Sequence, residues 1–285
     1  MNTQIQNIIA QVPAWQTAHH ITVEPQGGGL TNENYMITVD GERFVLRLSG
    51  ENTAVQAINR RTERDALLAA SRIGVAPEVI LFILPEGHLI TRLIEGRAWS
   101  VAEFQQPQVI RRVAETMRRV HALPPIEGMF SPYRDVEKRL AIAKTRQIAL
   151  PDQLELFLER MVQIEVARAA EIDSHLVLCH NDPFYNNFLD DGTVRLLDWE
   201  FAGMGDRFYD LASVAHLLPP EQRTYLLECY FGQATPEAVA AMEQMWFMVA
   251  FWNGTWALLQ IGTSYSDHDY RAMADHIFAR MAARL

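Results

Sequence analysis

The segment between Cys179 and Asp210 is rich in polar side chains with metal-binding or acid–base chemistry, and six of them are candidates for one polar site. In order along the chain they are His180, Asn181, Asp182, Asn187, Asp198 and Glu200. An apolar run at 176–178 precedes His180, and a second one at 194–197 precedes Asp198. A turn signal at 190–192 lies between the two runs. This pattern predicts a hairpin-like arrangement whose strands present polar groups at their ends. Because buried carboxylates need a neutralising cation, a divalent metal whose coordination is completed by phosphate oxygens is the simplest occupant.

The composition favours two lobes around packed cores. The chain has 285 residues, more than one average core accommodates, and 49% of them are apolar. A net charge of −10 argues against a nucleic-acid or anionic-membrane surface, because such a surface requires a basic stripe. The acidic balance is compatible with a small cationic substrate, although most acidic surfaces are only solvated.

The cysteine content and the N-terminus favour a cytoplasmic protein. Cys179 and Cys229 are the only cysteines, and the sequence contains no CxxC pair and no histidine cluster at zinc spacing. The first 15 residues lack the basic and apolar regions of a secretory signal. The longest apolar run, residues 245–252, is too short to span a bilayer. We therefore expect a soluble protein that binds neither membranes nor nucleic acid, and its oligomeric state is left open.

The pattern along the chain separates a strand-rich part from a helical part. Strand-like runs occur at 23–26, 35–39, 44–48, 79–82 and 88–92, with one helix predicted over 58–73. Helical periodicity dominates afterwards, at 107–121, 136–148, 152–171, 209–218, 221–230, 236–261 and 268–285. The sequence therefore predicts an α+β protein with a small β-rich lobe of residues 1–95 and a larger, mostly helical lobe of residues 96–285.

Two features of the first lobe are compatible with phosphate binding. A glycine-rich stretch at 26–35 lies between two predicted strands, where glycine amides can surround an anion or simply form a turn. Strand alternation places Arg47 opposite its apolar neighbours Leu46 and Leu48. Glu63, in the first turn of the predicted helix, could pair with Arg47 while the guanidinium reaches a phosphate. By spacing alone, an exposed arginine and a glutamate that favours a helix N-terminus are the simpler interpretation.

Aromatic residues concentrate in the predicted helix 236–261. Trp252 and Trp256 are four residues apart and therefore share a helix face. Core packing is the simplest interpretation for most aromatic residues of this helix. A tryptophan face also binds quaternary ammonium groups, with about 0.5 to 2 kcal/mol per ring, so two rings beside acidic residues would suit a choline-like cation. His121, at the end of an earlier predicted helix, is interpreted as structural.

Four motifs, in order along the chain, resemble those of one kinase superfamily. Residues 27–35, GGGLTNENY, are similar to the nucleotide loop of choline and ethanolamine kinases. Residues 180–187, HNDPFYNN, resemble the HxDxxxxN catalytic loop of the aminoglycoside phosphotransferase and choline kinase superfamily. Residues 197–202, LDWEFA, resemble the metal motif of choline and ethanolamine kinases, and residues 210–212, DLA, resemble the motif that follows it. Because the four motifs occur in the order of the family and the likeness covers nearly the whole chain, the resemblance is specific.

The resemblance implies a bilobal, protein-kinase-like fold with ATP in the cleft between the lobes. It implies that Asp182 orients and deprotonates the acceptor hydroxyl, and that Asn187 and Asp198 hold Mg²⁺. His180 would support the catalytic loop rather than carry protons. The nucleotide would contact Gly28, Gly29, Leu30, Thr31, Asn32, Arg47 and Glu63. The acceptor would contact Glu200, Phe201, Trp252 and Trp256. Phosphoryl transfer needs mainly positioning and charge neutralisation, which these groups can supply.

Three features depart from the family pattern. Arg47 occupies the strand position where many kinases have lysine, although arginine is common in the choline-kinase-like branch. Trp252 and Trp256 are separated by one residue more than the tryptophans of the family's WGxW-like helix, so only Trp256 is carried over directly. Phe201 stands where the family has tyrosine, which removes a hydroxyl from the expected pocket wall.

The sequence thus predicts an ATP- and Mg²⁺-dependent kinase of a small cationic alcohol, with choline or ethanolamine as the first candidates. Thiamine and aminoglycosides are alternative acceptors for the same fold. A catalytically silent nucleotide-binding protein is an alternative of another class, but it would have no physical need for Asp182, Asn187 and Asp198 together. A metal-dependent hydrolase is disfavoured, because the sequence near His180 lacks further histidine ligands.

Overall fold

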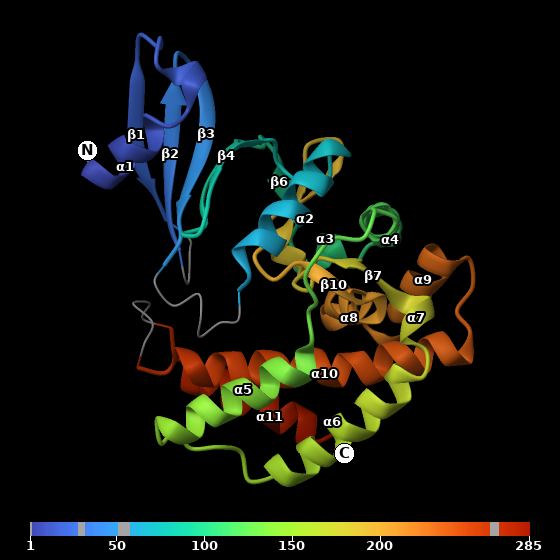
Figure 1. The fold of residues 1–285 in the computed structure, drawn as a ribbon. Helices are drawn as coiled ribbons and strands as arrows, with labels where there is room; N and C mark the ends of the chain where they lie inside the picture. The colour runs from blue at the N-terminus through green and yellow to red at the C-terminus, as the bar shows by residue number, and fades with distance from the viewer. Residues whose placement is uncertain (1, 28–31, 51–57, 263–267) are drawn as a thin grey trace.

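The N-terminal part of the chain folds around an antiparallel sheet. The computed structural model of the protein describes residues 2–27, 32–50, 58–262 and 268–285. Figure 1 shows the sheet as a lobe of its own beside the helical part of the molecule. Its strands pair in the order β1-β2-β3-β5-β4. Their bounds are Ile21–Gln26 (β1), Glu33–Val39 (β2), Glu42–Leu48 (β3), Val79–Ile83 (β4) and His88–Arg92 (β5). The five predicted strands and the α+β class are confirmed.

A short helix, α1 at Thr3–Ile9, packs against this sheet. Ile5 and Ile8 of α1 form a small core with Ile37 and Leu46 of the sheet, and each of these side chains is at most 3% exposed. Sequence periodicity did not predict α1, because a helix of seven residues has only two turns. The N-terminal lobe therefore has a hydrophobic core separate from the larger one.

The helix α2, Arg60–Arg72, joins the sheet to the helical lobe. The side chain of Asn59 caps its N-terminus by accepting two backbone N–H bonds. Ala66 and Leu67 of α2 are buried in the large core of the C-terminal lobe rather than in the core of the sheet. The helix that carries Glu63 is therefore packed against the helical lobe, whereas Glu63 itself faces the sheet.

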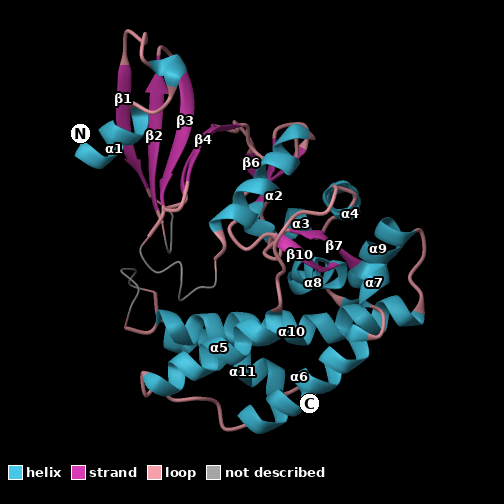
Figure 2. Cartoon of the chain, in the orientation of Figure 1, coloured by secondary structure: helices cyan, strands magenta, loops and turns pink. Residues whose placement is uncertain are grey.

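The C-terminal lobe is built around one long buried helix (Figure 2). This helix, α10, packs against α5, α6, α8 and α11. Because neighbours cover it on several sides, apolar residues occur all round it rather than on a single stripe. The helices of this lobe are α3 (Val101–Phe104), α4 (Pro107–His121), α5 (Pro132–Thr145), α6 (Leu154–Ala169), α7 (Ile172–His175), α8 (Arg207–Val214), α9 (Pro220–Phe231), α10 (Pro236–Gln260) and α11 (Tyr270–Ala282).

Short strands position the polar segment that dominates the sequence. They are β6 (Arg97–Ala98), β7 (Leu176–Cys179), β8 (Phe188–Asp190), β9 (Val194–Leu196) and β10 (Gly203–Asp206). The prediction that residues 176–178 and 194–197 form the arms of one hairpin is wrong. β7 pairs with β10, and the turn at 190–192 joins β9 to β8. A three-residue strand such as β8 is too short for an alternating pattern to reveal it or its register.

The sheet ends at Arg92, and the next strand, β6, pairs with β8 in the helical lobe. The predicted boundary at residues 95–96 lies between these two strands, and we retain it as a proposal. Among the described residues, no helix combines the length and the apolar character needed to cross a bilayer.

Candidate active site

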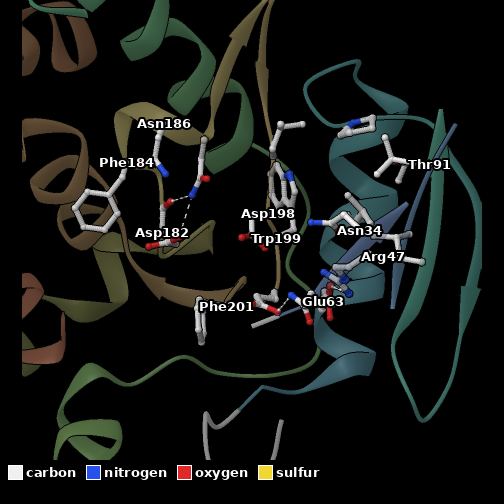
Figure 3. A pocket seen from close by; sticks show the side chains of 18 of the residues that line it. Asn34, Arg47, Glu63, Thr91, Asp182, Phe184, Asn186, Asp198, Trp199 and Phe201 are labelled. Atoms are coloured by element: carbon white, nitrogen blue, oxygen red, sulfur yellow. Dashed lines mark hydrogen bonds and ion pairs between the residues drawn. The ribbon is translucent and has the colours of Figure 1, made fainter. Parts of the chain in front are cut away.

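A cavity of about 740 Å³ lies between the sheet and the helical lobe. In Figure 3, Asp182 and Asp198 point into this space from the helical lobe, while Arg47 and Glu63 lie on the side of the sheet and α2. His180 does not line the cavity. The predicted site residues that line it are Asn32, Arg47, Glu63, Asp182, Asn187, Asp198, Glu200, Phe201, Trp252 and Trp256.

Asp182 and Asn187 are joined by hydrogen bonds on the helical side of the cavity. The Nδ2 group of Asn187 donates to Asp182 Oδ2 at 2.9 Å and to the Asp182 carbonyl oxygen at 2.8 Å. A 3₁₀ turn at Tyr185–Asn187 brings the two residues together. Burial and the nearby Asp198 carboxylate raise the pKa of Asp182 well above its usual value. Asp182 is therefore a stronger proton acceptor than a solvated aspartate.

Asn181, which directly precedes Asp182, and Asp198 both have a backbone conformation in the left-handed region. The φ angle is +66° at Asn181 and +63° at Asp198. Such a conformation costs roughly 1 kcal/mol or more, although asparagine and aspartate adopt it more readily than other non-glycine residues. Hydrogen bonds compensate at Asn181, whose N–H donates to Asp210 Oδ1 at 2.6 Å and whose Nδ2 donates to the Phe201 carbonyl at 3.0 Å. The backbone next to Asp182 is thereby fixed by elements outside its own loop.

Asp210 in α8 anchors the catalytic loop from the interior of the lobe. It is 0% exposed, and its Oδ2 accepts the His180 backbone N–H at 2.8 Å. Its Oδ1 accepts the Asn181 N–H, as described above, and His121 Nε2 lies 3.0 Å from Oδ2. Sequence reasoning gave this residue no role. The signal was nevertheless present, since Asp210 begins the DLA motif at 210–212.

His121, Cys179 and Asp210 also have potential metal-ligating atoms within 4.8 Å of one another. The His121 Nδ1 atom, however, lies 2.7 Å from the Tyr230 hydroxyl, and both oxygens of Asp210 are engaged. Burial raises the pKa of the Cys179 thiol and so disfavours the thiolate that a metal would require. We interpret the cluster as a hydrogen-bond network, in which His121 has the structural role expected for it.

His180 lies beneath the catalytic loop and is 0% exposed. Its Nδ1 accepts the Asp182 backbone N–H at 3.2 Å, and its Nε2 lies 2.9 Å from the Leu197 carbonyl oxygen. These partners place the ring proton on Nε2. Burial lowers the pKa of His180 to about 4, so the ring is neutral at pH 7. The ring thus links the loop that carries Asp182 to the chain segment that carries Asp198.

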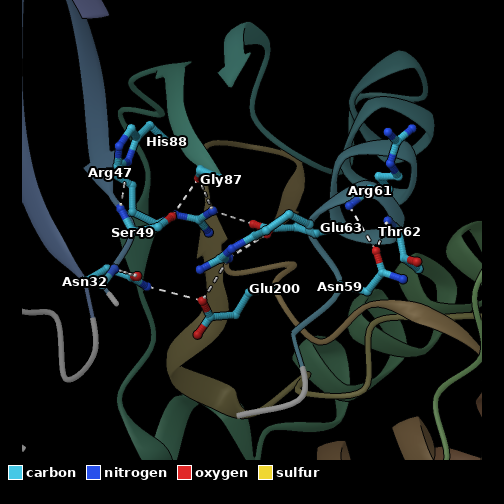
Figure 4. Close-up of polar contacts among 12 residues, drawn as sticks. Asn32, Arg47, Ser49, Asn59, Arg61, Thr62, Glu63, Gly87, His88 and Glu200 are labelled. Carbon is cyan, nitrogen blue, oxygen red and sulfur yellow. Dashed lines mark hydrogen bonds and ion pairs between the residues drawn. The ribbon is translucent and has the colours of Figure 1, made fainter. Parts of the chain in front are cut away.

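A chain of charged residues connects the two lobes beside the cavity (Figure 4). Arg47 Nη2 lies 2.5 Å from Glu63 Oε1, so the ion pair considered between strand and helix is present. The Arg47 side chain is 11% exposed, so the interpretation preferred from spacing alone, an exposed strand arginine, is wrong. Arg60 Nη1 lies 2.6 Å from the other Glu63 oxygen and 3.5 Å from Glu200 Oε2. Asn32 Nδ2 donates to the same Glu200 oxygen at 3.2 Å.

Glu200, predicted to contact the acceptor, is therefore engaged between the lobes and is 5% exposed. Sequence reasoning missed its partner Arg60. The available signal was local, because Arg60 precedes Glu63 by three residues on a helix face.

Asp198 follows β9 and remains open to the cavity. The surrounding protein and the Glu200 carboxylate raise the pKa of Asp198 to about 7, against the lowering effect of Arg47. Neighbouring carboxylates that raise each other's proton affinity form a site that a cation stabilises.

Aromatic side chains of the helical lobe line the same cavity, and we call Phe201, Trp252 and Trp256 the aromatic wall. Phe201 and Trp256 are partly exposed, whereas Trp252 is 2% exposed. Phe201 meets Trp252 edge-to-face, with 4.9 Å between the ring centroids. The guanidinium of Arg139 stacks on Trp252 at 3.7 Å from the ring centroid. A ligand cation therefore has better access to Phe201 and Trp256 than to Trp252.

Four of the residues predicted to contact the nucleotide, Gly28, Gly29, Leu30 and Thr31, lie outside the described part of the chain. Gly27 and Asn32, on either side of them, line the cavity. Asn32 Oδ1 also accepts the backbone N–H of Gly50 at 3.3 Å.

Comparison with known proteins agrees with this geometry. The family described as the phosphotransferase enzyme family matches residues 22–244. The chain belongs to this family. The protein LicA of Haemophilus influenzae is 26% identical to this phosphotransferase over 216 residues, which amount to 72% of this chain and 62% of LicA. The chain thus covers less than two thirds of the length of that relative.

Solved structures share the fold of this phosphotransferase. A choline/ethanolamine kinase family protein from Mesorhizobium loti has a TM-score of 0.78 at 28% identity, over 99% of this chain and 93% of that protein. The choline kinase LicA from Streptococcus pneumoniae has a TM-score of 0.80 at 20% identity, over 99% of this chain and 100% of the other. The predicted bilobal, protein-kinase-like fold is confirmed, and so is the predicted resemblance to choline and ethanolamine kinases.

The donor set of this phosphotransferase fits Mg²⁺. Asn187 Oδ1 and the Asp198 carboxylate are hard oxygen ligands, the kind that Mg²⁺ prefers. Burial and the Glu200 carboxylate raise the pKa of Asp198, and a divalent cation bound to its carboxylate would favour the ionised form. The roles of individual side chains in binding nucleotide, metal and acceptor stay predictions.

Proposed function

We propose that this phosphotransferase uses ATP and Mg²⁺ to phosphorylate the hydroxyl group of a small cationic alcohol, with choline or ethanolamine as the first candidates. The observation that carries the proposal is the convergence of Asp182, Asn187 and Asp198 in one cavity, between Arg47 and the aromatic wall. The names of the relatives support the same acceptor class. We also propose a cytoplasmic location, supported by two free cysteines.

Arg47 is the side chain best placed to meet the nucleotide phosphates. Its guanidinium is fixed by Glu63 and by a 3.0 Å hydrogen bond to the Gly87 carbonyl. A guanidinium held in this way can present its remaining N–H groups to phosphate oxygens without losing further side-chain entropy. Mg²⁺ bound by Asn187 and Asp198 would neutralise charge on the transferring phosphoryl group.

Asp182 is the proposed base. Its Oδ2 would accept a hydrogen bond from the acceptor hydroxyl and take its proton as the phosphoryl group transfers. Asn187 keeps the carboxylate oriented, through the hydrogen bonds already described. Burial favours the protonated form of Asp182, so transfer of the proton to this group is favourable as the oxygen attacks.

Phe201 and Trp256 would receive the cationic end of the acceptor. A quaternary ammonium group donates no hydrogen bonds, so aromatic faces and carboxylates at a distance are its suitable partners. The partly exposed rings and the overall net charge of −10 both favour a cation in this cavity.

Release of ADP in the presence of a panel of acceptors tests the proposal. The panel contains choline, ethanolamine, thiamine and kanamycin, each with ATP and Mg²⁺. Asp182→Ala should lower turnover by roughly 10²- to 10⁴-fold, the usual contribution of a positioned base. Asp191→Ala, which alters an exposed turn residue paired with Arg195, should leave turnover unchanged.

The outcomes separate the alternatives. Absence of ADP with every acceptor, despite measurable ATP binding, would favour a catalytically silent binding protein. Turnover of Asp182→Ala at the wild-type rate would remove Asp182 from the mechanism. The highest kcat/KM with thiamine or kanamycin would replace the acceptor but keep the phosphoryl transfer.

A further inference from the structure

The helix α5 places a buried arginine directly behind the aromatic wall. Arg139 is 1% exposed, and the central carbon of its guanidinium lies 3.7 Å from the centroid of the Trp252 ring. Its Nη1 donates to the Trp252 carbonyl oxygen at 3.1 Å. Burial lowers the pKa of Arg139 to about 10, so the group is still protonated at neutral pH. One side chain thus contacts both the ring and the backbone of Trp252.

Asp135, one turn earlier on α5, holds the edge of the same indole. Trp252 Nε1 donates to Asp135 Oδ2 at 3.0 Å. Because Asp135 and Arg139 are four residues apart, they lie on one face of α5 and act on Trp252 together. The carboxylate also supplies opposite charge close to the buried guanidinium.

The aromatic ring is a principal partner of this guanidinium. Among the described residues, Arg139 Nε and Nη2 have no hydrogen-bond partner. A guanidinium stacked on an indole is attracted to the electron-rich face of the ring, most strongly when both are removed from water. The stacking therefore restrains the rotation of the Trp252 side chain more than apolar packing alone would.

We propose that Arg139 is a positioning residue that fixes the Trp252 indole as a rigid part of the acceptor pocket. This inference rests on the proposed function, because it assigns the cavity beside Trp252 to the acceptor. Because Arg139 covers one face of the Trp252 ring, Trp252 restricts which acceptor shapes fit the pocket. Phe201 and Trp256 contact the positive charge of the acceptor. Arg139 itself touches neither the cavity nor the reacting groups.

A matched pair of variants tests the inference. Arg139→Met replaces the guanidinium by an apolar chain of similar length and leaves Asp135 its hydrogen bond from Trp252 Nε1. Arg146→Met is the control, since Arg146, the residue directly after α5, donates through Nη1 at 3.1 Å to the carbonyl of Leu259, seven residues after Trp252 on α10. The control removes the same kind of bond without affecting the indole.

The acceptors are choline and its neutral isostere 3,3-dimethylbutan-1-ol. Arg139→Met should raise KM for both by a similar factor, about 2- to 30-fold, the range that corresponds to loss of one cation–π contact. Its kcat should stay close to the wild-type value, and Arg146→Met should change neither constant. A KM that changes for choline alone would overturn the inference in favour of a purely electrostatic role. An unchanged KM for both acceptors would reduce Arg139 to a packing residue.

A second readout does not depend on activity. The protein, which has six tryptophans, is labelled with 5-fluorotryptophan, and Trp252→Phe assigns the Trp252 resonance in the ¹⁹F NMR spectrum. Arg139→Met should shift and broaden this resonance, whereas Arg146→Met should not. An unaltered, narrow resonance in Arg139→Met would refute the positioning role, even if no acceptor were turned over.

Arg139→Lys serves if the methionine variant does not fold. It keeps the charge but lacks the planar group, so the same spectral change is expected. A wild-type spectrum in the lysine variant would show that stacking is not required.

Discussion

Replacement of Asp210 by asparagine would test how α8 holds the catalytic loop. The carboxylate accepts three hydrogen bonds, from the backbone N–H groups of His180 and Asn181 and from His121. In Asp210→Asn the amide oxygen can still accept the hydrogen bonds from His180 and His121. The amide nitrogen, itself a donor, then faces the Asn181 N–H and cannot accept its hydrogen bond. One charge-assisted bond is lost, at about 1.5–3 kcal/mol, and a buried N–H is left unsatisfied, at about 1–3 kcal/mol. We expect a total loss of about 2.5–6 kcal/mol in the free energy of unfolding.

The same change should slow catalysis. Asn181, held at φ +66° with the help of Asp210, directly precedes Asp182. Its release should misplace the base, and a displacement of about 1 Å can cost roughly 10²-fold in kcat. A domain with a stability near the middle of the ordinary range, about 10 kcal/mol, still folds after such a loss, so turnover can be measured.

Urea denaturation and the ADP-release assay together give the result. Asp206→Asn is the control. Asp206 is a buried carboxylate at the start of α8, the helix that also carries Asp210. It pairs with Arg168 at 2.8 Å and does not contact the catalytic loop. It should lose stability but keep its kcat. Wild-type kcat in Asp210→Asn, or a loss of stability below about 1 kcal/mol, would refute the reasoning.

Two further predictions concern stability. Burial and neighbouring arginines lower the pKa of His216 to about 4, so the unfolded chain binds more protons between pH 4 and 6.5, and stability is lost as the pH falls through this window. Between pH 7 and pH 5, the free energy of unfolding of His216→Phe should therefore fall by about 2 kcal/mol less than that of the wild type, as measured by urea denaturation at both values. Equal decreases would contradict this assignment. Gly128 has φ +109°, and a Cβ there would collide with the side chain of Thr62, whereas Gly232 has φ +86° and open space around it. Gly128→Ala should lower the free energy of unfolding by at least about 2 kcal/mol more than Gly232→Ala, for which backbone strain of about 1 kcal/mol is expected. Similar unfolding midpoints of the two variants in urea would argue against the collision.

Local patterns in the chain were sufficient for most of the framework. Alternation and turn residues identified the five strands of the sheet, and helical periodicity located the long helices, because each depends on neighbours a few residues away. The motif at 180–187 likewise placed Asp182 and Asn187 in one catalytic loop, but their hydrogen bonds to each other were not predicted. Short elements such as α1 and β8 were missed, since they contain too few residues for a period to be visible.

The tertiary structure alone decided which distant residues meet. The pairing of β7 with β10, the bridge from Arg60 to Glu200 and the stacking of Arg139 on Trp252 each join segments that lie far apart in the chain, the last two more than one hundred residues apart. Nothing in the local sequence around either partner specifies such a contact, because it depends on how whole elements pack. A buried arginine and a solvated one have the same neighbours in sequence, and only the packing of α5 against α10 removes Arg139 from water and places an indole against it.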